Sequence, residues 1–136
     1  ELVLDSWAVM AWLKGQQPAA ERVRVMLQTA ERREHKLFMN IVNLGEVFYL
    51  CAKAKDLAYS ERVLQSLLTR IGTVSATDEL VLEAAKLKAK YPISYADAFA
   101  VVTAMLREAP LVTGDPELLA VAGVEKTFKL EWLADR

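Results

Sequence analysis

Four acidic side chains in this sequence occupy positions at which carboxylates can act together. Asp5 directly follows the apolar run Leu2–Leu4, and Asp115 follows the run Leu111–Thr113 after one glycine. Both runs are apolar or β-branched and are predicted to be strands. Because the carboxyl ends of parallel strands lie at one edge of a sheet, we expect Asp5 and Asp115 to emerge at the same edge.

Glu46 and Asp97 each lie three residues after a residue type that commonly caps helices, Asn43 and Ser94 respectively. This spacing predicts that both acids lie on the first turn of a helix. In a doubly wound sheet the amino ends of such helices share the edge at which ligands bind. All four acids are therefore expected to meet at this edge.

Each of these acids also has a simpler explanation, as a helix cap or as a first-turn acid stabilised by the helix dipole. Asp5 can cap a helix that begins near Trp7, and Asp115 can cap the helix that follows it. Capping does not explain why Glu46 and Asp97 lie among mostly apolar or small residues, which places them beside the core. Carboxylates partly removed from water are costly unless cations or hydrogen bonds compensate them.

A divalent cation would compensate a group of neighbouring carboxylates. The single cysteine, Cys51, lies in an apolar stretch, and the single histidine, His35, lies in a charged run where a solvated surface side chain is expected. The available ligands are therefore oxygens, which suit Mg²⁺ or Mn²⁺ rather than zinc or copper. One cysteine cannot form an intrachain disulfide, and this fits a reducing, cytoplasmic setting.

The elements that must position these acids follow an alternating pattern. Short apolar or β-branched runs lie at residues 2–4, 37–39, 72–74 and 111–113, and longer segments of helical periodicity separate them. This alternation predicts an α/β fold with a central, mainly parallel sheet of four to five short strands flanked by helices. Ser60, Thr77 and Ser94 are expected helix caps, and residues 126–133 could form a fifth strand or a helix.

The length and composition are those expected of one compact domain. Of the 136 residues, 54% are hydrophobic and 26% are charged, which is enough to bury a core and unlike a disordered chain. We therefore expect residues 1–136 to form a single domain. The formal net charge of -1 means that any site for a polyanion must be local. No apolar stretch reaches the roughly 20 residues that cross a bilayer, so no membrane association is expected.

Four short motifs occur in order along nearly the whole chain: Leu2–Ser6, Asn43–Val47, Tyr95–Ala100 and Val112–Leu118. Their order and spacing resemble the PIN-domain ribonucleases, and most closely the VapC toxins of prokaryotic toxin–antitoxin pairs. Each motif alone is weak, but four in register make the resemblance specific. It implies a three-layer PIN-like fold.

The resemblance also implies a site and an activity. Asp5, Glu46, Asp97 and Asp115 would be the acidic quartet that holds one or two Mg²⁺ or Mn²⁺ ions. Thr113 matches the family's hydroxyl residue and would position a carboxylate or a water, although it could equally be an ordinary β-branched strand residue. The implied activity is endonucleolytic hydrolysis of RNA phosphodiester bonds. The implied partners are RNA, a cognate antitoxin and a second copy of the chain.

Two other classes of function remain open. A phosphatase of the haloacid dehalogenase type has Asp-x-Asp after its first strand, and Asp5-Ser6-Trp7 lacks the second aspartate. The other alternative is a catalytically inactive PIN-like interaction module.

The short helix around Trp7 and Trp12 is apolar nearly all round, so part of it could be a docking surface for the antitoxin unless both tryptophans belong to the core.

Overall fold

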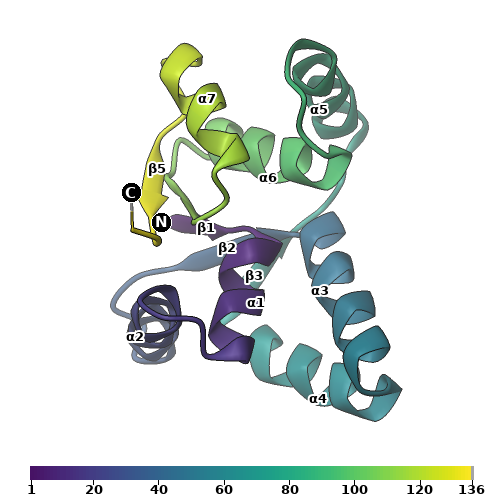
Figure 1. Cartoon of the computed structure of the whole chain (residues 1–136), viewed down its shortest axis with the longest axis vertical. Helices are drawn as coiled ribbons and strands as arrows, with labels where there is room; N and C mark the ends of the chain where they lie inside the picture. Colours follow the sequence, from purple (N-terminus) through teal and green to yellow (C-terminus); the bar gives the residue numbers. More distant parts are fainter. Residues whose placement is uncertain (136) are drawn as a thin grey trace.

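A sheet of five parallel strands forms the centre of the computed structural model, which describes residues 1–135. The strands are β1 (Leu2–Leu4), β2 (Leu37–Asn40), β3 (Ile71–Val74), β4 (Leu111–Thr113) and β5 (Leu130–Trp132). Their order is β3-β2-β1-β4-β5, and every neighbouring pair is parallel. The strands β1 and β4, which precede Asp5 and Asp115, therefore lie side by side at the centre of the sheet (Figure 1).

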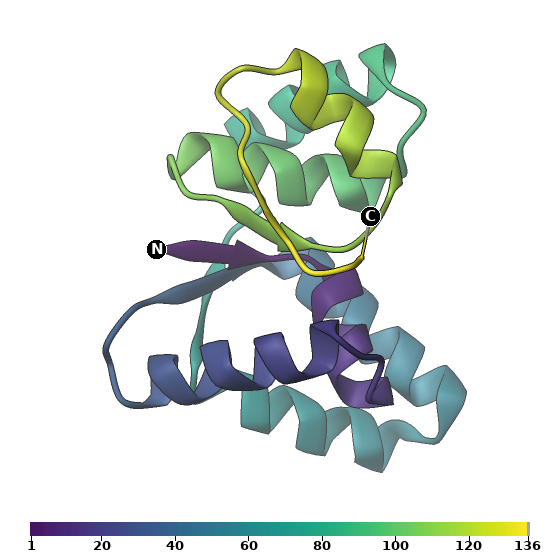
Figure 2. The same cartoon turned by 60° about the vertical axis from the view of Figure 1, so that its left-hand side comes forward.

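Helices cover both faces of this sheet (Figure 1 and Figure 2). They are α1 (Ser6–Lys14), α2 (Ala19–Glu31), α3 (Ile41–Ala54), α4 (Leu57–Leu68), α5 (Asp78–Lys90), α6 (Tyr95–Leu106) and α7 (Glu117–Val124). The helices α1 to α4 pack on one face, and α5 to α7 pack on the other. The predicted α/β architecture, with helices flanking a parallel sheet, is confirmed.

Two apolar cores lie on opposite faces of the sheet because successive residues of a strand point to opposite sides. In β1, Val3 belongs to the core between the sheet and α5 to α7, and Leu4 belongs to the core between the sheet and α1 to α4. In β4, Leu111 and Val112 divide in the same way. All four side chains are fully buried. Burial on both faces explains why these strands read as continuous apolar runs.

The amino end of α3 differs from the prediction. The cap is Asn40, whose side chain accepts a hydrogen bond from the backbone N–H of Val42 at 2.9 Å. Asn43, the predicted cap, is buried inside the first turn and donates Nδ2 to the backbone oxygen of Ala96 at 2.9 Å. The helix begins directly after β2, so Glu46 lies on its second turn and not on its first.

The predicted cap Ser60 is also wrong, because α4 begins one turn earlier. Asp56 caps this helix by accepting from the backbone N–H of Tyr59 at 2.8 Å. Ser60 lies inside the helix and donates to the backbone oxygen of Phe48 at 2.9 Å. Aspartate caps helices as well as serine does, so local sequence did not distinguish the two positions. The predicted caps Thr77 and Ser94 are confirmed.

The C-terminal segment, for which a strand and a helix were both open, forms β5 beside β4. None of the helices in residues 1–135 is long and apolar enough to cross a bilayer.

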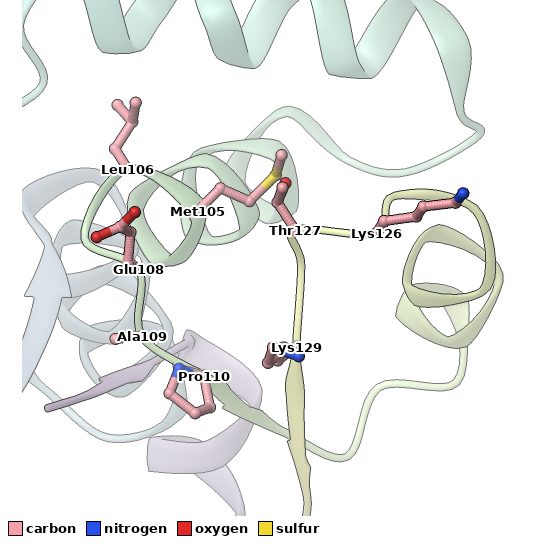
Figure 3. A pocket seen from close by; sticks show the side chains of 8 residues that line it. All are labelled: Met105, Leu106, Glu108, Ala109, Pro110, Lys126, Thr127 and Lys129. Atoms are coloured by element: carbon pink, nitrogen blue, oxygen red, sulfur yellow. The ribbon is translucent and has the colours of Figure 1, made fainter.

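A cavity of about 560 Å³ lies where the chain enters β4 and β5, between Leu106, Pro110 and Lys129 (Figure 3). None of the predicted acids lines this cavity, which lies at the amino ends of its strands.

Candidate active site

Asp5 lies immediately after β1 and is completely buried. Its Oδ1 accepts a hydrogen bond from the backbone N–H of Ala8 at 2.8 Å and so caps α1. Its Oδ2 is also buried and has no partner in hydrogen-bonding geometry among residues 1–135. Capping therefore accounts for one oxygen of this carboxylate and leaves the other without a role.

The environment of Asp5 disfavours its ionised form. Burial raises the pKa of Asp5 to about 7, and the charges of Asp97 and Asp115 contribute in the same direction. The nearby hydroxyl of Thr113 and the backbone N–H of Ala8 oppose this rise because they stabilise the carboxylate. Thr113 is fully buried at the end of β4, and its Oγ1 accepts from the backbone N–H of Asp115 at 3.1 Å. A hydroxyl thus lies between two of the predicted acids.

Asp97 lies on the first turn of α6, as predicted. The cap Ser94 accepts a hydrogen bond from the Asp97 backbone N–H at 3.1 Å, so the helix start directs this acid toward the sheet edge. Burial raises the pKa of Asp97 to about 6, and the neighbouring charges of Asp115, Glu46 and Glu117 raise it as well. Ser94 opposes this rise. The coupling to three other carboxylates shows that acids from separate elements converge here.

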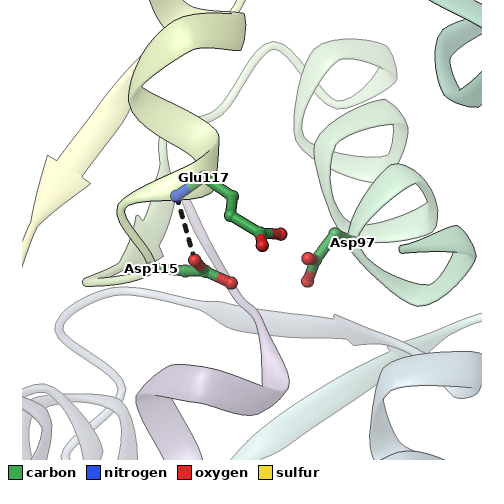
Figure 4. Close-up of side chains that lie close together, drawn as sticks. All are labelled: Asp97, Asp115 and Glu117. Carbon is green, nitrogen blue, oxygen red and sulfur yellow. Dashed lines mark hydrogen bonds between the residues drawn. The ribbon is translucent and has the colours of Figure 1, made fainter. Parts of the chain in front are cut away.

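Asp115 and Glu117 complete the group from the turn between β4 and α7. Asp115 Oδ1 accepts from the backbone N–H of Glu117 at 3.0 Å, which supports the start of α7 (Figure 4). One carboxylate oxygen from each of Asp97, Asp115 and Glu117 lies within 4.8 Å of the others. Glu117 was not among the predicted site residues. Its place at the start of a helix gave it an ordinary role for an acid, and only its proximity to Asp97 in space identifies it.

Glu46 reaches the same region from the second turn of α3. Its Oε1 accepts a hydrogen bond from the hydroxyl of Ser6, the first residue of α1. Glu46, Asp97 and Asp115 line one pocket of about 260 Å³, and Lys14 is the basic residue of that pocket. The structure therefore brings the four acids of the predicted quartet together. Three line this pocket, and Asp5 is buried beside it, where the charges of Asp97 and Asp115 raise its pKa.

Trp7, on α1, packs against the turn that follows β4. A Cβ atom added to Gly114 would lie 2.3 Å from an atom of the Trp7 ring, so this position tolerates only glycine without movement of the ring. Trp7 and Trp12 are both partly buried, and Trp7 also lines the acidic pocket. The indole thus packs against the backbone between Thr113 and Asp115. The prediction that this helix docks an antitoxin stays a prediction.

The donor set suits a hard divalent cation. It consists of carboxylate oxygens, one of them buried without a hydrogen bond, and two of the acids have raised pKa values. Like-charged carboxylates that are crowded and desolvated gain stability when a cation neutralises them. All the acids of this group contribute oxygen, and oxygen ligands favour Mg²⁺ or Mn²⁺. The arrangement can hold a metal ion and, through it, a phosphate.

A family model described as the PIN domain matches residues 2–124. No curated protein sequence matches the chain significantly. Solved structures match its fold at low sequence identity. VapBC2 from Rickettsia felis, bound to a DNA fragment from its promoter, has a TM-score of 0.73 and 16% identity, and the match covers 98% of both chains.

Two further structures show the same similarity of fold. VapC20 from Mycobacterium tuberculosis, described as a sarcin-ricin loop cleaving toxin, has a TM-score of 0.71 and 14% identity over 89% of this chain and 95% of that one. VapBC-1 from nontypeable Haemophilus influenzae has a TM-score of 0.66 and 18% identity over 95% of this chain and 96% of that one. These matches span nearly the whole length of both partners.

Proposed function

The chain belongs to the PIN domain family, and we propose that it is a metal-dependent endoribonuclease that acts as the toxin of a toxin–antitoxin pair. The observation that carries this proposal is the buried Asp5, whose Oδ2 has no hydrogen-bond partner among the described residues, beside a group of carboxylates from α3, α6 and the β4–α7 turn. A helix cap needs only one of the two oxygens. A metal site explains the second oxygen and the crowding of the acids together.

In this proposal Asp5, Glu46, Asp97 and Asp115 hold one or two Mg²⁺ or Mn²⁺ ions. When bound, such an ion activates water for attack on a phosphodiester and stabilises the negative charge that develops on the phosphate. Three of the four acids lie at the ends of rigid elements, which keeps their geometry fixed.

The remaining polar residues act on these acids or on the substrate. Ser6 orients Glu46 by donating a hydrogen bond to it. The nearby hydroxyl of Thr113 lowers the pKa of Asp5 and so favours its ionised form, and Glu117 adds a carboxylate on the solvent side. The acids repel RNA, so the substrate needs a cation from the protein as well. We propose that Lys14, which lines the acidic pocket, binds a phosphate of the RNA.

The partners in this proposal are an RNA substrate, a protein antitoxin and a second copy of the chain. The structures that the fold matches include VapB–VapC complexes, some bound to DNA, and this supports the antitoxin proposal. We place the action of the protein in the cytoplasm, where its proposed RNA substrate lies. We also propose that residues 1–136 act as one nuclease domain.

An RNA cleavage assay tests the proposal. The purified chain should cleave RNA with Mn²⁺ and not with a chelator. The substitution Asp97→Asn keeps the size of the side chain and should lower the cleavage rate at least about 100-fold, as does the loss of charge stabilisation in other active sites. Mn²⁺ binding, measured by calorimetry, should weaken in the same variant.

Asp78→Asn is the matched control, because Asp78 is also a first-turn helix acid and lies on α5, away from the acidic pocket. This control should cleave and bind like the unmodified chain. Absence of both Mn²⁺ binding and cleavage in the unmodified chain would favour the alternative, an inactive PIN-like interaction module.

A further inference from the structure

Another pocket, of about 270 Å³, lies at the amino ends of β2 and β3, at the opposite edge of the sheet from the acidic group. The end of α2, the α2–β2 connection and the residues that begin β3 form its walls. Figure 2 shows this connection on the side of the sheet where the N-terminus lies. The basic residues Arg33, Lys36 and Arg70 line the pocket with His35, and no carboxylate of residues 1–135 does. We refer to it as the basic pocket.

The positive charge of the basic pocket is not neutralised within the described residues. Arg33 and Lys36 are exposed, and neither makes an ion pair or a side-chain hydrogen bond in residues 1–135. The nearby Glu34 instead lies 3.8 Å from Arg32, measured from Oε1 to Nε. Three cations, two from the α2–β2 connection and one directly before β3, therefore face one small volume that no acid among residues 1–135 lines. Such an arrangement attracts an anion.

Arg70 is held in place before any ligand arrives. Its Nε donates to the backbone oxygen of Ser66 at 3.3 Å, and its Nη2 donates to the Ser66 hydroxyl. Its guanidinium carbon lies 5.7 Å from the centre of the Trp12 ring. A guanidinium has five N–H donors, so these bonds leave others available. A cation already fixed in orientation loses little entropy when it binds a ligand.

His35 differs from the expectation of a solvated surface side chain. It is partly buried, and its Nε2 is buried without a hydrogen-bond partner among residues 1–135. Buried polar atoms in folded proteins nearly always have a partner. His35 lines the basic pocket, so a ligand there is a natural candidate for the missing partner.

The backbone at Arg33 adds a further observation. Its φ is 60°, and the bonds from Arg33 N to Ala30 O (2.9 Å) and from Glu34 N to Thr29 O (3.1 Å) end α2 in a motif that favours glycine. An arginine in this conformation is less stable than a glycine would be. A basic residue at a helix end can also simply complement the helix dipole. That role does not account for Lys36, which directly precedes β2, or for Arg70, which directly precedes β3.

We propose that the basic pocket binds a phosphate group of a nucleotide, either free or within an RNA strand. Arginine forks match the geometry of phosphate oxygens, and charge-assisted hydrogen bonds of this kind are the stronger ones. The volume lies just below the roughly 300 Å³ at which pockets take whole drug-sized ligands, so it suits a phosphate with part of its nucleoside. This binding requires neither a metal nor cleavage, so it stands independently of the proposed nuclease.

His35 provides the test, because it is the only histidine in the chain and its ring gives a single set of NMR signals. The full chain is titrated, in chelator and at constant ionic strength, with inorganic phosphate, then with a nucleoside monophosphate, then with a short RNA. We expect a saturable shift of the His35 signals, with dissociation constants in the millimolar range or tighter. The double substitution Arg33→Gln and Lys36→Gln should weaken binding at least about tenfold, because it removes two charged donors.

The double substitution Lys126→Gln and Lys129→Gln is the matched control, since it removes two positive charges from the cavity of Figure 3, which also contains Glu108. This control should bind phosphate like the unmodified chain. Tighter binding of the monophosphate than of inorganic phosphate identifies a free nucleotide as the source, and tighter binding of the RNA identifies its backbone. Shifts that do not saturate, or equal weakening in both double variants, would overturn the proposal.

Discussion

At the scale of single residues, Asp5 combines a structural role with an oxygen that is free to bind the proposed metal ion. Its Oδ1 caps α1, and its Oδ2 is buried without a partner among residues 1–135. Two asparagines have separate structural roles at the start of α3. Asn40 caps the helix, and Asn43 joins it to α6 by donating a hydrogen bond to the backbone oxygen of Ala96. The bond from Asn43 thus connects α3 to α6 beside the site.

Glu117 provides the prediction at this scale. The substitution Glu117→Gln should lower Mn²⁺ affinity by on the order of 10-fold, because it removes one carboxylate from the group with Asp97 and Asp115. Calorimetric titration with Mn²⁺ measures this change. Glu79→Gln is the control, since Glu79 is a first-turn acid of α5 that does not line the acidic pocket. If the Mn²⁺ affinity of Glu117→Gln were unchanged, Glu117 would not be a metal ligand and would only support the start of α7.

At the scale of elements, the site depends on how closely α1 approaches the turn after β4. Trp7 on α1 packs against Gly114, and the atoms that a Cβ would meet all belong to the six-membered ring of the indole. This contact sets the separation between the residues that follow β1 and β4. A loss of this packing should therefore move Asp5 and Asp115 relative to each other.

Gly114→Ala tests this contact between elements. We expect it to lower the free energy of unfolding by about 1–3 kcal/mol, the range for overpacked interiors, and to weaken Mn²⁺ binding. Adding Trp7→Phe, which shortens the ring, should recover part of the stability, and chemical denaturation of the four chains measures this coupling. Gly123→Ala on α7 is the control, because an added Cβ there meets nothing within 4 Å. Equal losses in the two alanine variants would contradict the role of Trp7.

At the scale of the whole molecule, charge is divided between the two edges of the sheet. The carboxyl edge carries the acidic group, and the amino edge carries the basic pocket. The formal net charge of -1 conceals this separation because it sums 17 basic and 18 acidic side chains over the whole chain. Electrostatic steering of a nucleic acid would therefore depend on local fields and not on overall charge.

The dependence of stability on pH tests the crowding of the acids. The pKa of Asp5 is about 7 and that of Asp97 is about 6 in the folded state, against an ordinary value of 3.8. Between about pH 4 and 7 the folded chain therefore binds more protons than the unfolded chain, so its stability should fall as the pH rises. In chelator we expect Asp5 to contribute a decline on the order of 3 kcal/mol across this window, measured by chemical denaturation.

Asp5→Asn should flatten this decline, because asparagine can still cap α1 but does not ionise. Mn²⁺ at neutral pH should restore stability to the unmodified chain and much less to the variant. A decline of the same size in Asp5→Asn would show that the buried carboxylate is not its cause.

The sequence by itself determined the elements and the approximate place of the four acids. Alternating apolar runs and helical segments identified the parallel sheet, because burial on both faces leaves a local pattern. Asp5 and Asp115 follow strands, and this fact alone placed them at one edge. The helix starts at Ser60 and Asn43 were wrong because several residues nearby cap equally well, and packing chose among them.

Only the tertiary structure decided which polar atoms lack partners and which residues from distant segments meet. The unpartnered Oδ2 of Asp5, the inclusion of Glu117 in the acidic group, and the meeting of His35 with Arg70 each depend on contacts across the fold. The physical reason is the distance along the chain over which each kind of interaction acts. Caps and periodicity arise from interactions within one or two helical turns, whereas desolvation and the sum of charges at a site depend on every element packed around it.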